Sequence, residues 1–299
     1  MMKYWMGMDI GGTSARLKIA REGEEAREYF TKGCTLSTVG YEKTKQCYEK
    51  AVLPVLKSLD LKPEDCAGLC IAASGIDSAG QEEECRRIFE EMGFPLENVG
   101  VYNDCEIFLR LSEEPSLVLV AGTGSIAFGR SASGRIVRSG GGGSAMDMGK
   151  RVLRAVGDHM DGRRSCPVLF GLFEEQSKIS SLARLDTYLN ENIMDKPRIA
   201  CFAPLAERAA EQGEKAGEEI LEECAEALYA LVKDTYRKTA EAAGEPQNLY
   251  LWGSVLTRNK RMESLVRKKC VEEFPALKAA FPEMTALDLA FRIAAHKTM

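Results

Sequence analysis

Short apolar segments along this chain alternate with longer segments whose apolar residues recur at helical spacing. Residues 3–10 and 15–20 are apolar or alternating, and Gly11-Gly12-Thr13-Ser14 separates them, which predicts a β-hairpin. A strand follows these glycines, whereas a helix follows the glycines of a Rossmann unit, and a P-loop also requires Gly-Lys-Ser or Gly-Lys-Thr. The pattern therefore excludes both of these nucleotide motifs here.

Helical and strand patterns alternate through the rest of the first half. Residues 41–58 predict a helix that Pro54 kinks or divides. Residues 67–73 and 98–102 are short apolar runs that predict buried strands, the first of them ending at Ser74-Gly75. Strands that alternate with helices predict an α/β fold with a partly parallel sheet.

The second half repeats the opening pattern. Residues 117–130, LVLVAGTGSIAFGR, read as strand, glycine turn and strand, which predicts either a duplicated domain or an unrelated glycine-rich hairpin. Four glycines and Ser144 then precede a helical stretch. This pattern predicts either free backbone N–H groups at the helix start that point at a ligand, or a flexible linker. The remaining patterns predict a largely helical region, a buried strand with a helix start, and an amphipathic helix, over 202–243, 248–257 and 285–297.

Composition narrows the classes of partner. The 299 residues are 45% hydrophobic with a formal net charge of −5, so no basic stripe for nucleic acid is expected, and no apolar run approaches the roughly 18 residues of a membrane span. Asp9 lies too early for a signal peptide, and ten scattered cysteines are typical of reduced thiols. We therefore expect a cytoplasmic protein that binds neither nucleic acid nor membrane.

The two glycine turns and two aspartates suit phosphate chemistry. Glycines let backbone N–H groups approach phosphate oxygens, and Thr or Ser adds hydroxyl donors. Asp9 ends the first strand beside such a turn, and because two anions repel, its natural partner is Mg²⁺ on a nucleotide phosphate. Asp104 follows a buried strand and Asn103, which favours either a general base for an attacking hydroxyl or a cap for a helix over 105–111.

The order and approximate spacing of several segments resemble those of the BadF/BadG/BcrA/BcrD-type ATPase and N-acetylglucosamine kinase family, within the sugar kinase, Hsp70 and actin superfamily. These segments are MDIGGT, YNDCEIFL, VAGTGSIAFGR, SAMDMGKRVLRAVGDHMDGR, FAPLAERAAEQGEKAGEEILEECAEAL and LWGSV. The resemblance covers nearly the whole chain. It implies an α/β fold of two ribonuclease-H-like domains, residues 1–112 and 113–284, with the helix 285–299 rejoining the first domain and ATP and Mg²⁺ in an interdomain cleft.

The resemblance also implies roles for particular residues. Asp104 resembles the catalytic base that takes a proton from a sugar hydroxyl, and Asp9 resembles the aspartate that holds magnesium through water. The residues that match the nucleotide-binding turns are Gly11, Gly12, Thr13, Gly122, Thr123, Gly124, Ser125, Gly253 and Ser254. The candidate substrate contacts are Ser74, Gly75, Asn103, Asp104, Gly143 and Ser144.

This chain departs from the family pattern near the expected substrate and nucleoside. Amino-sugar kinases of the family have the sequence Gly-Asp-Glu-Gly-Ser where residues 140–144 of this chain are four glycines and Ser144. Gly141 and Gly142 therefore replace the acidic pair. Thr35 stands at the place of an asparagine that contacts the sugar, and Trp252 precedes Gly253 where the adenosine turn has two glycines. The phosphate motifs are intact, whereas N-acetylglucosamine itself is not assured as the substrate.

Three hypotheses follow. The first is an ATP-dependent kinase that phosphorylates a hydroxyl of a small sugar or amino sugar, with a homodimer as the base-rate expectation. The second is an ATPase that drives a partner, like the family's activators of acyl-CoA reductases and dehydratases, although the chain lacks their cysteine-bearing glycine motif. The third is a nucleotide or sugar sensor without catalysis, which would not need both Asp9 and Asp104.

Overall fold

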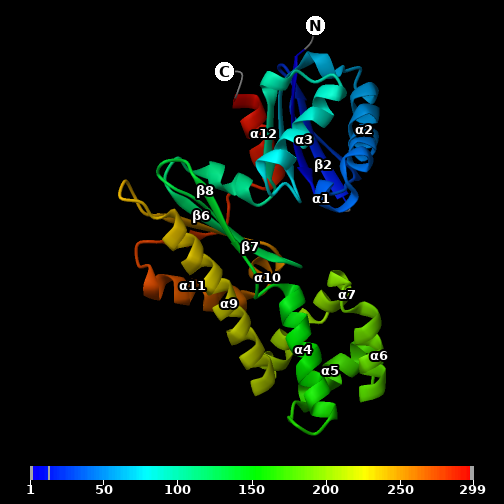
Figure 1. Cartoon of the computed structure of the whole chain (residues 1–299), viewed down its shortest axis with the longest axis vertical. Coiled ribbons are helices and arrows are strands. Elements are labelled where there is room, and N and C mark those ends of the chain that lie inside the picture. The colour runs from blue at the N-terminus through cyan, green and yellow to red at the C-terminus, as the bar shows by residue number, and fades with distance from the viewer. Residues whose placement is uncertain (1–2, 13, 297–299) are drawn as a thin grey trace. The chain divides into compact units, whose positions relative to one another are not determined.

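The structure, a computed structural model, describes residues 3–12 and 14–296. The chain divides into two compact units, one of Met1–Glu113 together with Pro282–Met299, the other of Glu114–Phe281. Each unit is built on a five-stranded sheet that carries helices (Figure 1). In the described part of the chain, no helix is both long enough and apolar enough to cross a membrane.

The sheet of the first unit has the order β3-β2-β1-β4-β5. β1 pairs antiparallel with β2, which pairs antiparallel with β3, while β1, β4 and β5 are parallel. Burial alternates along β2 but is nearly continuous along β4, a central strand. The predicted hairpin and both predicted buried strands are confirmed, with the bounds β1 (Tyr4–Ile10), β2 (Ser14–Arg21), β3 (Arg27–Lys32), β4 (Cys66–Ala73) and β5 (Val99–Asn103).

The helices of the first unit are α1 (Leu36–Val39), α2 (Tyr41–Ser58), α3 (Ala79–Glu91) and α12 (Ala286–His296), with short 3₁₀ turns at Pro63–Asp65, Leu96–Asn98 and Glu106–Leu111. α2 continues through Pro54, so the predicted division of this helix is wrong. The proline is exposed, and its ring therefore displaces no core side chain. Tyr48, Val52 and Leu56 on the opposite side of α2 are buried in the core of the unit.

α12 packs against β1 and β4 although it is the last helix of the chain. Glycines permit this close approach, because a Cβ on Gly7 would lie 2.5 Å from the Cα of Phe291. Lys18 on β2 also donates a hydrogen bond of 2.5 Å to the carboxylate of Asp288 on α12. The helix therefore covers one face of the first sheet.

The sheet of the second unit repeats the strand pattern of the first, in the order β10-β9-β6-β7-β8. β6, β7 and β8 form an antiparallel meander, and β6, β9 and β10 are parallel. This shared pattern agrees with a duplication rather than with an isolated glycine-rich hairpin. The strands are β6 (Ser116–Ala121), β7 (Ser125–Arg130), β8 (Ile136–Gly140), β9 (Asn248–Trp252) and β10 (Lys278–Ala280).

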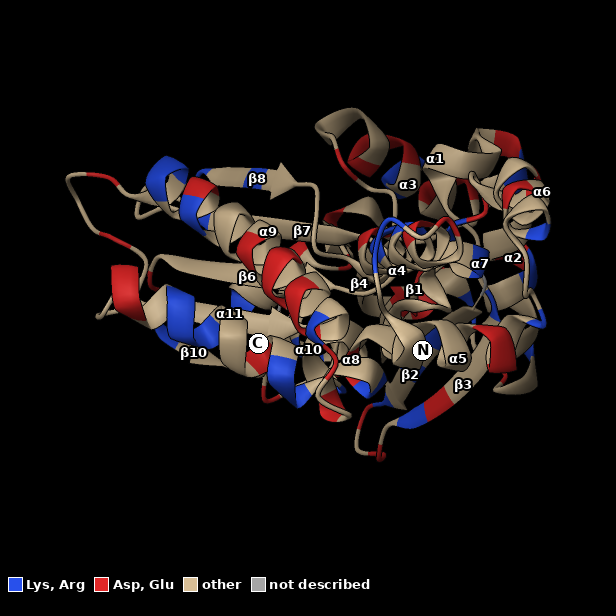
Figure 2. Cartoon of the chain, turned by 90° about the horizontal axis from the view of Figure 1, so that it is seen from below, with Lys and Arg blue, Asp and Glu red and all other residues tan. Residues whose placement is uncertain are grey.

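Helices make up most of the rest of the second unit. The predicted helical region 202–243 contains two helices, which separate at Gly213, where φ is +78°. Acidic residues are concentrated in the first half of α9 and basic residues in its last turns (Figure 2). The helices are α4 (Ala145–Met160), α5 (Pro167–Ser177), α6 (Leu182–Asn192), α7 (Lys196–Ala200), α8 (Ala203–Glu211), α9 (Lys215–Thr239), α10 (Ser254–Thr257) and α11 (Lys260–Glu273).

Candidate functional site

Several candidate residues of the first unit meet at one edge of its sheet. β1, β4 and β5 are parallel, so the residues that follow them lie at the same edge. The N–H of Ser74 donates to the carbonyl of Ile10 at 2.8 Å, and the N–H of Asp104 donates to the carbonyl of Ala73 at 3.3 Å. The N–H of Gly11 donates to Ser14 at 2.9 Å across the first turn. Thr13, predicted to belong to this turn, lies outside the described residues.

Asp9 is paired with an arginine that sequence reasoning missed. Arg16 is its cross-strand partner in the hairpin, and the guanidinium lies 2.5 Å from Asp9 Oδ2. The side chain of Asp9 is 20% exposed and that of Arg16 is 37% exposed. In an antiparallel hairpin, residues at equal distances from the turn lie opposite each other, so the sequence itself could have paired Asp9 with Arg16. The carboxylate of Asp9 is thus held beside the turn, with one oxygen bound to the arginine.

Asp104 is a carboxyl group whose ionisation is disfavoured. Burial raises its pKa from 3.8 to about 6, and the negative charge of Asp9 also raises it. The thiol of Cys105 lies 3.5 Å from Asp104 Oδ1 and donates to it, which acts in the opposite direction and stabilises the carboxylate. A carboxyl group with this pKa accepts a proton more readily than an ordinary aspartate.

Asn103 performs the capping that was one alternative for Asp104. Its Oδ1 accepts from the N–H of Cys105 at 2.8 Å and from the N–H of Glu106 at 3.4 Å. Its Nδ2 donates to the carbonyl of Ile76 at 3.0 Å and to Asp77 Oδ1 at 3.3 Å. Asn103 is only 5% exposed. The amide therefore fixes the loop after β4, and the carboxyl of Asp104 is not needed as a helix cap.

Thr35, just before α1, and Ser37, in its first turn, lie close to the loop that follows β4. Gly75 has φ of +78°, and a Cβ there would lie 2.5 Å from Ser37 Oγ and 3.3 Å from the Cβ of Thr35. The hydroxyl of Thr35 donates to Thr38 at 2.7 Å. Gly75 is thus required for this close approach. It brings the hydroxyls of Thr35 and Ser37 to the candidate substrate contacts at the end of β4.

The second glycine turn joins β6 to β7 in the second unit. The N–H of Gly122 donates to the carbonyl of Gly124 at 2.8 Å, and a Cβ on either glycine would meet nothing within 4 Å. The backbone of this turn is therefore open to a ligand. The hydroxyl of Ser125 lies 2.6 Å from the carbonyl of Gly141 and 2.8 Å from that of Gly142. A hydroxyl has one proton, so Ser125 donates it to the glycine stretch.

The start of α4 differs from the sequence expectation. Ser144 is its N-cap and accepts from the N–H of Asp147 at 3.2 Å. The next two N–H groups bind the second glycine turn, Ala145 to Gly122 at 2.8 Å and Met146 to Thr123 at 3.2 Å. The expectation of free N–H groups directed at a ligand is therefore wrong for these positions. They hold the glycine turn in place instead.

The glycine stretch is packed, so the alternative of a flexible linker is also wrong. Gly143 has φ of +81°, and a Cβ there would lie 2.5 Å from the carbonyl oxygen of Cys224. Its N–H donates to Asp147 Oδ2 at 2.7 Å. A Cβ on Gly142 would lie 3.1 Å from the same carboxylate oxygen. Asp147 therefore fills space beside Gly142, where the family pattern has an acidic residue.

Gly253 and Ser254 connect β9 to α10 beside a cavity of about 260 Å³. Gly253 has φ of +93°, and a Cβ there would lie 2.6 Å from the carbonyl carbon of Ala121. The turn therefore packs directly on the end of β6. The residues that line the cavity are Ala145, Met148, Ala200, Ala203, Pro204, Glu207, Ser254, Val255, Arg258 and Asn259.

We expect Gly253→Ala to lower the free energy of unfolding by about 3 kcal/mol, because both the left-handed backbone and the contact with Ala121 oppose a side chain. Gly134→Ala is the matched control: φ is +83° there, but nothing lies within 4 Å of its Cβ, so only the backbone cost of about 1 kcal/mol remains. Urea unfolding of both variants measures the difference. Equal losses would show that the contact with β6 is readily relaxed.

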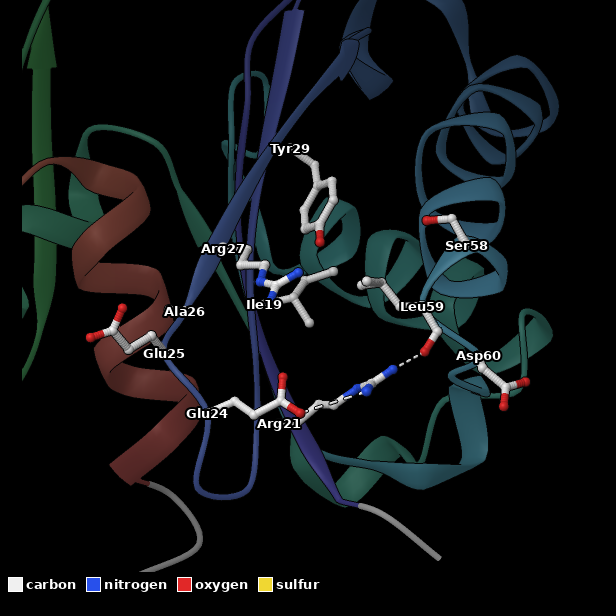
Figure 3. A pocket seen from close by; sticks show the side chains of 10 residues that line it. All are labelled: Ile19, Arg21, Glu24, Glu25, Ala26, Arg27, Tyr29, Ser58, Leu59 and Asp60. Carbon is white, nitrogen blue, oxygen red and sulfur yellow. Dashed lines mark hydrogen bonds and ion pairs between the residues drawn. The ribbon is translucent and has the colours of Figure 1, made fainter.

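A larger cavity of about 620 Å³ lies at the other end of β2, remote from the first glycine turn. Arg27 and Tyr29 of β3 point into it, and Arg21 crosses it to donate to the carbonyl of Leu59 (Figure 3). Glu24 also lies 3.6 Å from Arg21. None of the predicted site residues that the structure describes lines this cavity.

Two curated proteins are similar to most of this chain. An N-acetylmuramic acid/N-acetylglucosamine kinase of Clostridium acetobutylicum is 27% identical over 242 residues, which are 78% of this chain and 79% of that protein. An N-acetyl-D-glucosamine kinase of Dictyostelium discoideum is 23% identical over 292 residues, which are 91% of this chain and 92% of that protein. The similarity in both cases extends over both structural units.

Solved structures share the fold. A structure from Chromobacterium violaceum has a TM-score of 0.72 at 18% identity and covers 97% of this chain and 98% of its own. A glucokinase from Balamuthia mandrillaris in complex with glucose has a TM-score of 0.55 at 15% identity, with coverage of 98% and 94%. With the two five-stranded sheets, this likeness confirms the predicted α/β fold, which is of the actin-like type.

A family model that matches nearly the whole length of the chain identifies its family. Residues 6–280 match the model of the BadF/BadG/BcrA/BcrD ATPase family. The match includes both glycine turns, Asp9, Asp104 and the turn at Gly253. This chain therefore belongs to the BadF/BadG/BcrA/BcrD ATPase family.

Proposed function

We propose that this protein is an ATP-dependent kinase that transfers the γ-phosphoryl group of ATP to a hydroxyl of a sugar or amino sugar. The observation that carries the proposal is the carboxyl group of Asp104, at the carboxyl edge of the first sheet, with a pKa raised to about 6. The names of the two curated relatives, both amino-sugar kinases, support the same reaction class. Membership of an ATPase family supports ATP as the phosphoryl donor.

Asp104 is the proposed general base. The ionised carboxyl accepts the proton of the attacking sugar hydroxyl as the oxygen bonds to the γ-phosphorus and the bond to the β-phosphate oxygen breaks, which releases ADP. The thiol of Cys105 donates to Asp104 Oδ1, so this contact favours the ionised form that the reaction requires. Asn103 accepts from the N–H of Cys105 and donates to the carbonyl of Ile76, so it ties the backbone after Asp104 to the loop after β4 and thereby fixes the position of the carboxyl.

The proposed nucleotide contacts are distributed over three turns. The space beside the backbone at Gly122 and Gly124 is open and fits phosphate oxygens, although the N–H of Gly122 itself donates within the turn to the carbonyl of Gly124. Gly11 and Gly12 form the corresponding turn in the first unit. The cavity beside Ser254 is lined by apolar side chains together with Glu207, Arg258 and Asn259, which suits a base and ribose.

Asp9 is the proposed magnesium-binding residue. A carboxylate oxygen is a ligand that Mg²⁺ prefers, directly or through water, and Asp9 lies beside the first glycine turn. Oδ2 accepts from Arg16, so Oδ1 is the oxygen that suits a metal-bound water. The ion would neutralise phosphate charge during transfer. The positive charge of Arg16 opposes the metal and orients the carboxylate at the same time.

The proposed sugar contacts are Ser74, Gly75, Gly143 and Ser144, together with Asp104. Asn103, predicted as a further contact, has its amide engaged by Ile76, Asp77, Cys105 and Glu106 and therefore acts by positioning Asp104. The acidic pair of the family's amino-sugar kinases is absent at Gly141 and Gly142, and the nearest carboxylate, Asp147, already binds the N–H of Gly143. Fewer acceptors for sugar hydroxyls therefore remain in this loop. We expect an acceptor other than N-acetylglucosamine to be among the best substrates.

The test is ADP release from Mg-ATP with a panel of amino sugars, N-acetylated sugars, hexoses and polyols, each beside a control without acceptor. Stimulation by one acceptor class is expected and names the substrate. ADP release that no acceptor changes would favour an ATPase coupled to a partner protein. ATP binding without turnover in any mixture would favour a sensor.

The proposal also fixes the pH dependence of the reaction. Because the base must be ionised and the pKa of Asp104 is raised to about 6, we expect kcat/KM to be constant above about pH 7 and to fall about tenfold per pH unit well below pH 6. An ordinary aspartate would keep its activity down to about pH 4. A profile that stays flat to pH 5 while the protein remains folded contradicts the assignment.

A further inference from the structure

Three lysines line one pocket of the first unit. The pocket has a volume of about 340 Å³ and lies between the end of β3 and the first half of α2. Its lining residues are Thr31, Lys32, Gly33, Lys43, Gln46, Cys47, Lys50 and Ala51. No carboxylate is among them, so the charge at the pocket wall is entirely positive.

No other side chain in residues 3–12 and 14–296 neutralises these lysines. In the part of the chain that the structure describes, the side chains of Lys32, Lys43 and Lys50 make no ion pair or hydrogen bond. By contrast, Lys45 on the same helix pairs with Glu91 at 2.7 Å. Three uncompensated ammonium groups around one hollow repel one another and attract an anion.

The sequence of α2 separates its charges into two stripes. Lys43, Cys47 and Lys50 recur at helical spacing and face the pocket. Glu42 and Glu49 lie on a different side of the helix, where their charges act on Lys45. Neither acidic residue of α2 is among the residues that line the pocket.

We propose that this pocket is a binding site for a phosphate dianion, either inorganic phosphate or the phosphate group of a small sugar phosphate. Three ammonium groups offer one donor to each of the three terminal oxygens of a phosphate monoester and more than compensate its two negative charges, and the amide of Gln46 and the hydroxyl of Thr31 add further polar groups. The volume admits a small organic phosphate. This site is separate from the proposed nucleotide and sugar contacts.

The pocket adjoins the first glycine turn through a single residue. Gly33 lines the pocket, and a Cβ there would lie 2.6 Å from the carbonyl carbon of Ser14, with the carbonyl oxygen of Gly11 also in contact. A ligand in the pocket would therefore lie beside Gly33, which packs on the start of β2 next to this turn. The inference does not depend on the kinase reaction, because the lysines bind the anion without any chemical step.

Protection of Cys47 from iodoacetamide tests the proposal. Cys47 lines the pocket and is partly accessible, whereas Cys201 in the second unit is exposed and serves as an internal control. We expect inorganic phosphate or glucose 6-phosphate to slow the labelling of Cys47 but not of Cys201, by about tenfold at about ten times the Kd. Mass spectrometry of the labelled peptides measures both rates in the same sample.

Two arms separate this site from the proposed active site and from simple salt screening. Protection must persist when the nonhydrolysable analogue AMP-PNP saturates the nucleotide site, and sodium chloride at the same ionic strength must not reproduce it. Loss of protection in AMP-PNP would overturn the proposal in favour of phosphate at the nucleotide site. Equal protection by chloride would overturn it in favour of nonspecific screening.

Variants of the lysines complete the test. We expect Lys43→Gln/Lys50→Gln to weaken phosphate protection at least about tenfold, since each removes a charged donor. Lys57→Gln, an exposed substitution on α2 outside the pocket, should leave protection unchanged. Circular dichroism verifies that both variants are folded. Undiminished protection in a folded double variant contradicts the site, and Lys32→Gln then tests the strand side of the pocket by the same measurement.

Discussion

Asp104→Asn is expected to lower acceptor-dependent ADP release by about 10²–10⁴-fold while ATP binding is retained. Asparagine keeps the shape of the side chain but cannot accept a proton from the sugar hydroxyl. Because Asp104 lies in the first unit and makes no proposed contact with ATP, the Kd of AMP-PNP should change less than about twofold. Steady-state kinetics with the best acceptor and calorimetric titration with AMP-PNP measure the two effects separately.

The same substitution should stabilise the protein. The folded-state pKa of Asp104 is raised from 3.8 to about 6, so between these values the folded protein binds more protons than the unfolded chain. The free energy of unfolding consequently falls as the pH rises through this window, and the penalty is fully present at pH 7. Removing the charge should recover roughly 1–2 kcal/mol.

Loss of activity together with a gain in stability distinguishes a functional carboxylate from a structural one. Asp186→Asn on the exposed side of α6 is the matched control and should change neither quantity. Near-normal turnover in Asp104→Asn would remove the general base from the proposed mechanism. A variant that is both inactive and less stable would indicate that Asp104 mainly supports the fold.

Local sequence signals predicted the strands and most helices well. The two hairpins were predictable because glycine turns interrupt alternating apolar residues. No end of the observed strands Tyr4–Ile10 and Ser14–Arg21 differs by more than one residue from the predicted ranges. The sheet order was not predicted, because no local signal in the sequence states which strand lies beside β1. Of the two effects predicted for Pro54, a kink or a division, the division is wrong, because the sequence does not show that this side of α2 is exposed.

The site was predictable in its residue types but not in its contacts. Asp9 stands out near the end of an apolar strand and Asp104 directly after one, yet their partners Arg16 and Cys105 were not identified from the sequence. The N–H groups at the start of α4 looked free because their acceptors, Gly122 and Thr123, are distant in sequence. Hydrogen bonds between such segments depend on the packing of the whole unit, which local patterns do not contain.

Asp9→Asn is expected to raise the Mg²⁺ concentration for half-maximal activity about tenfold or more and to lower kcat about 10²-fold. The amide keeps a carbonyl oxygen but removes the charge that attracts the ion beside the first glycine turn. Protein stability should fall by less than about 1 kcal/mol, because the pair with Arg16 is partly exposed. Activity measured over a series of Mg²⁺ concentrations at fixed free ATP separates metal affinity from catalysis.

Arg16→Gln provides the opposing variant for the same site. Arg16 holds Oδ2 of Asp9 at 2.5 Å, so it competes electrostatically with a cation at the same carboxylate. If Asp9 binds the magnesium, removing this competitor should lower the Mg²⁺ requirement severalfold, by about 1 kcal/mol of binding energy at a partly exposed pair. The two substitutions then shift the requirement in opposite directions. An unchanged requirement in both variants would mean that Asp9 serves only to fix the hairpin, because a purely structural pair has no reason to respond to the metal.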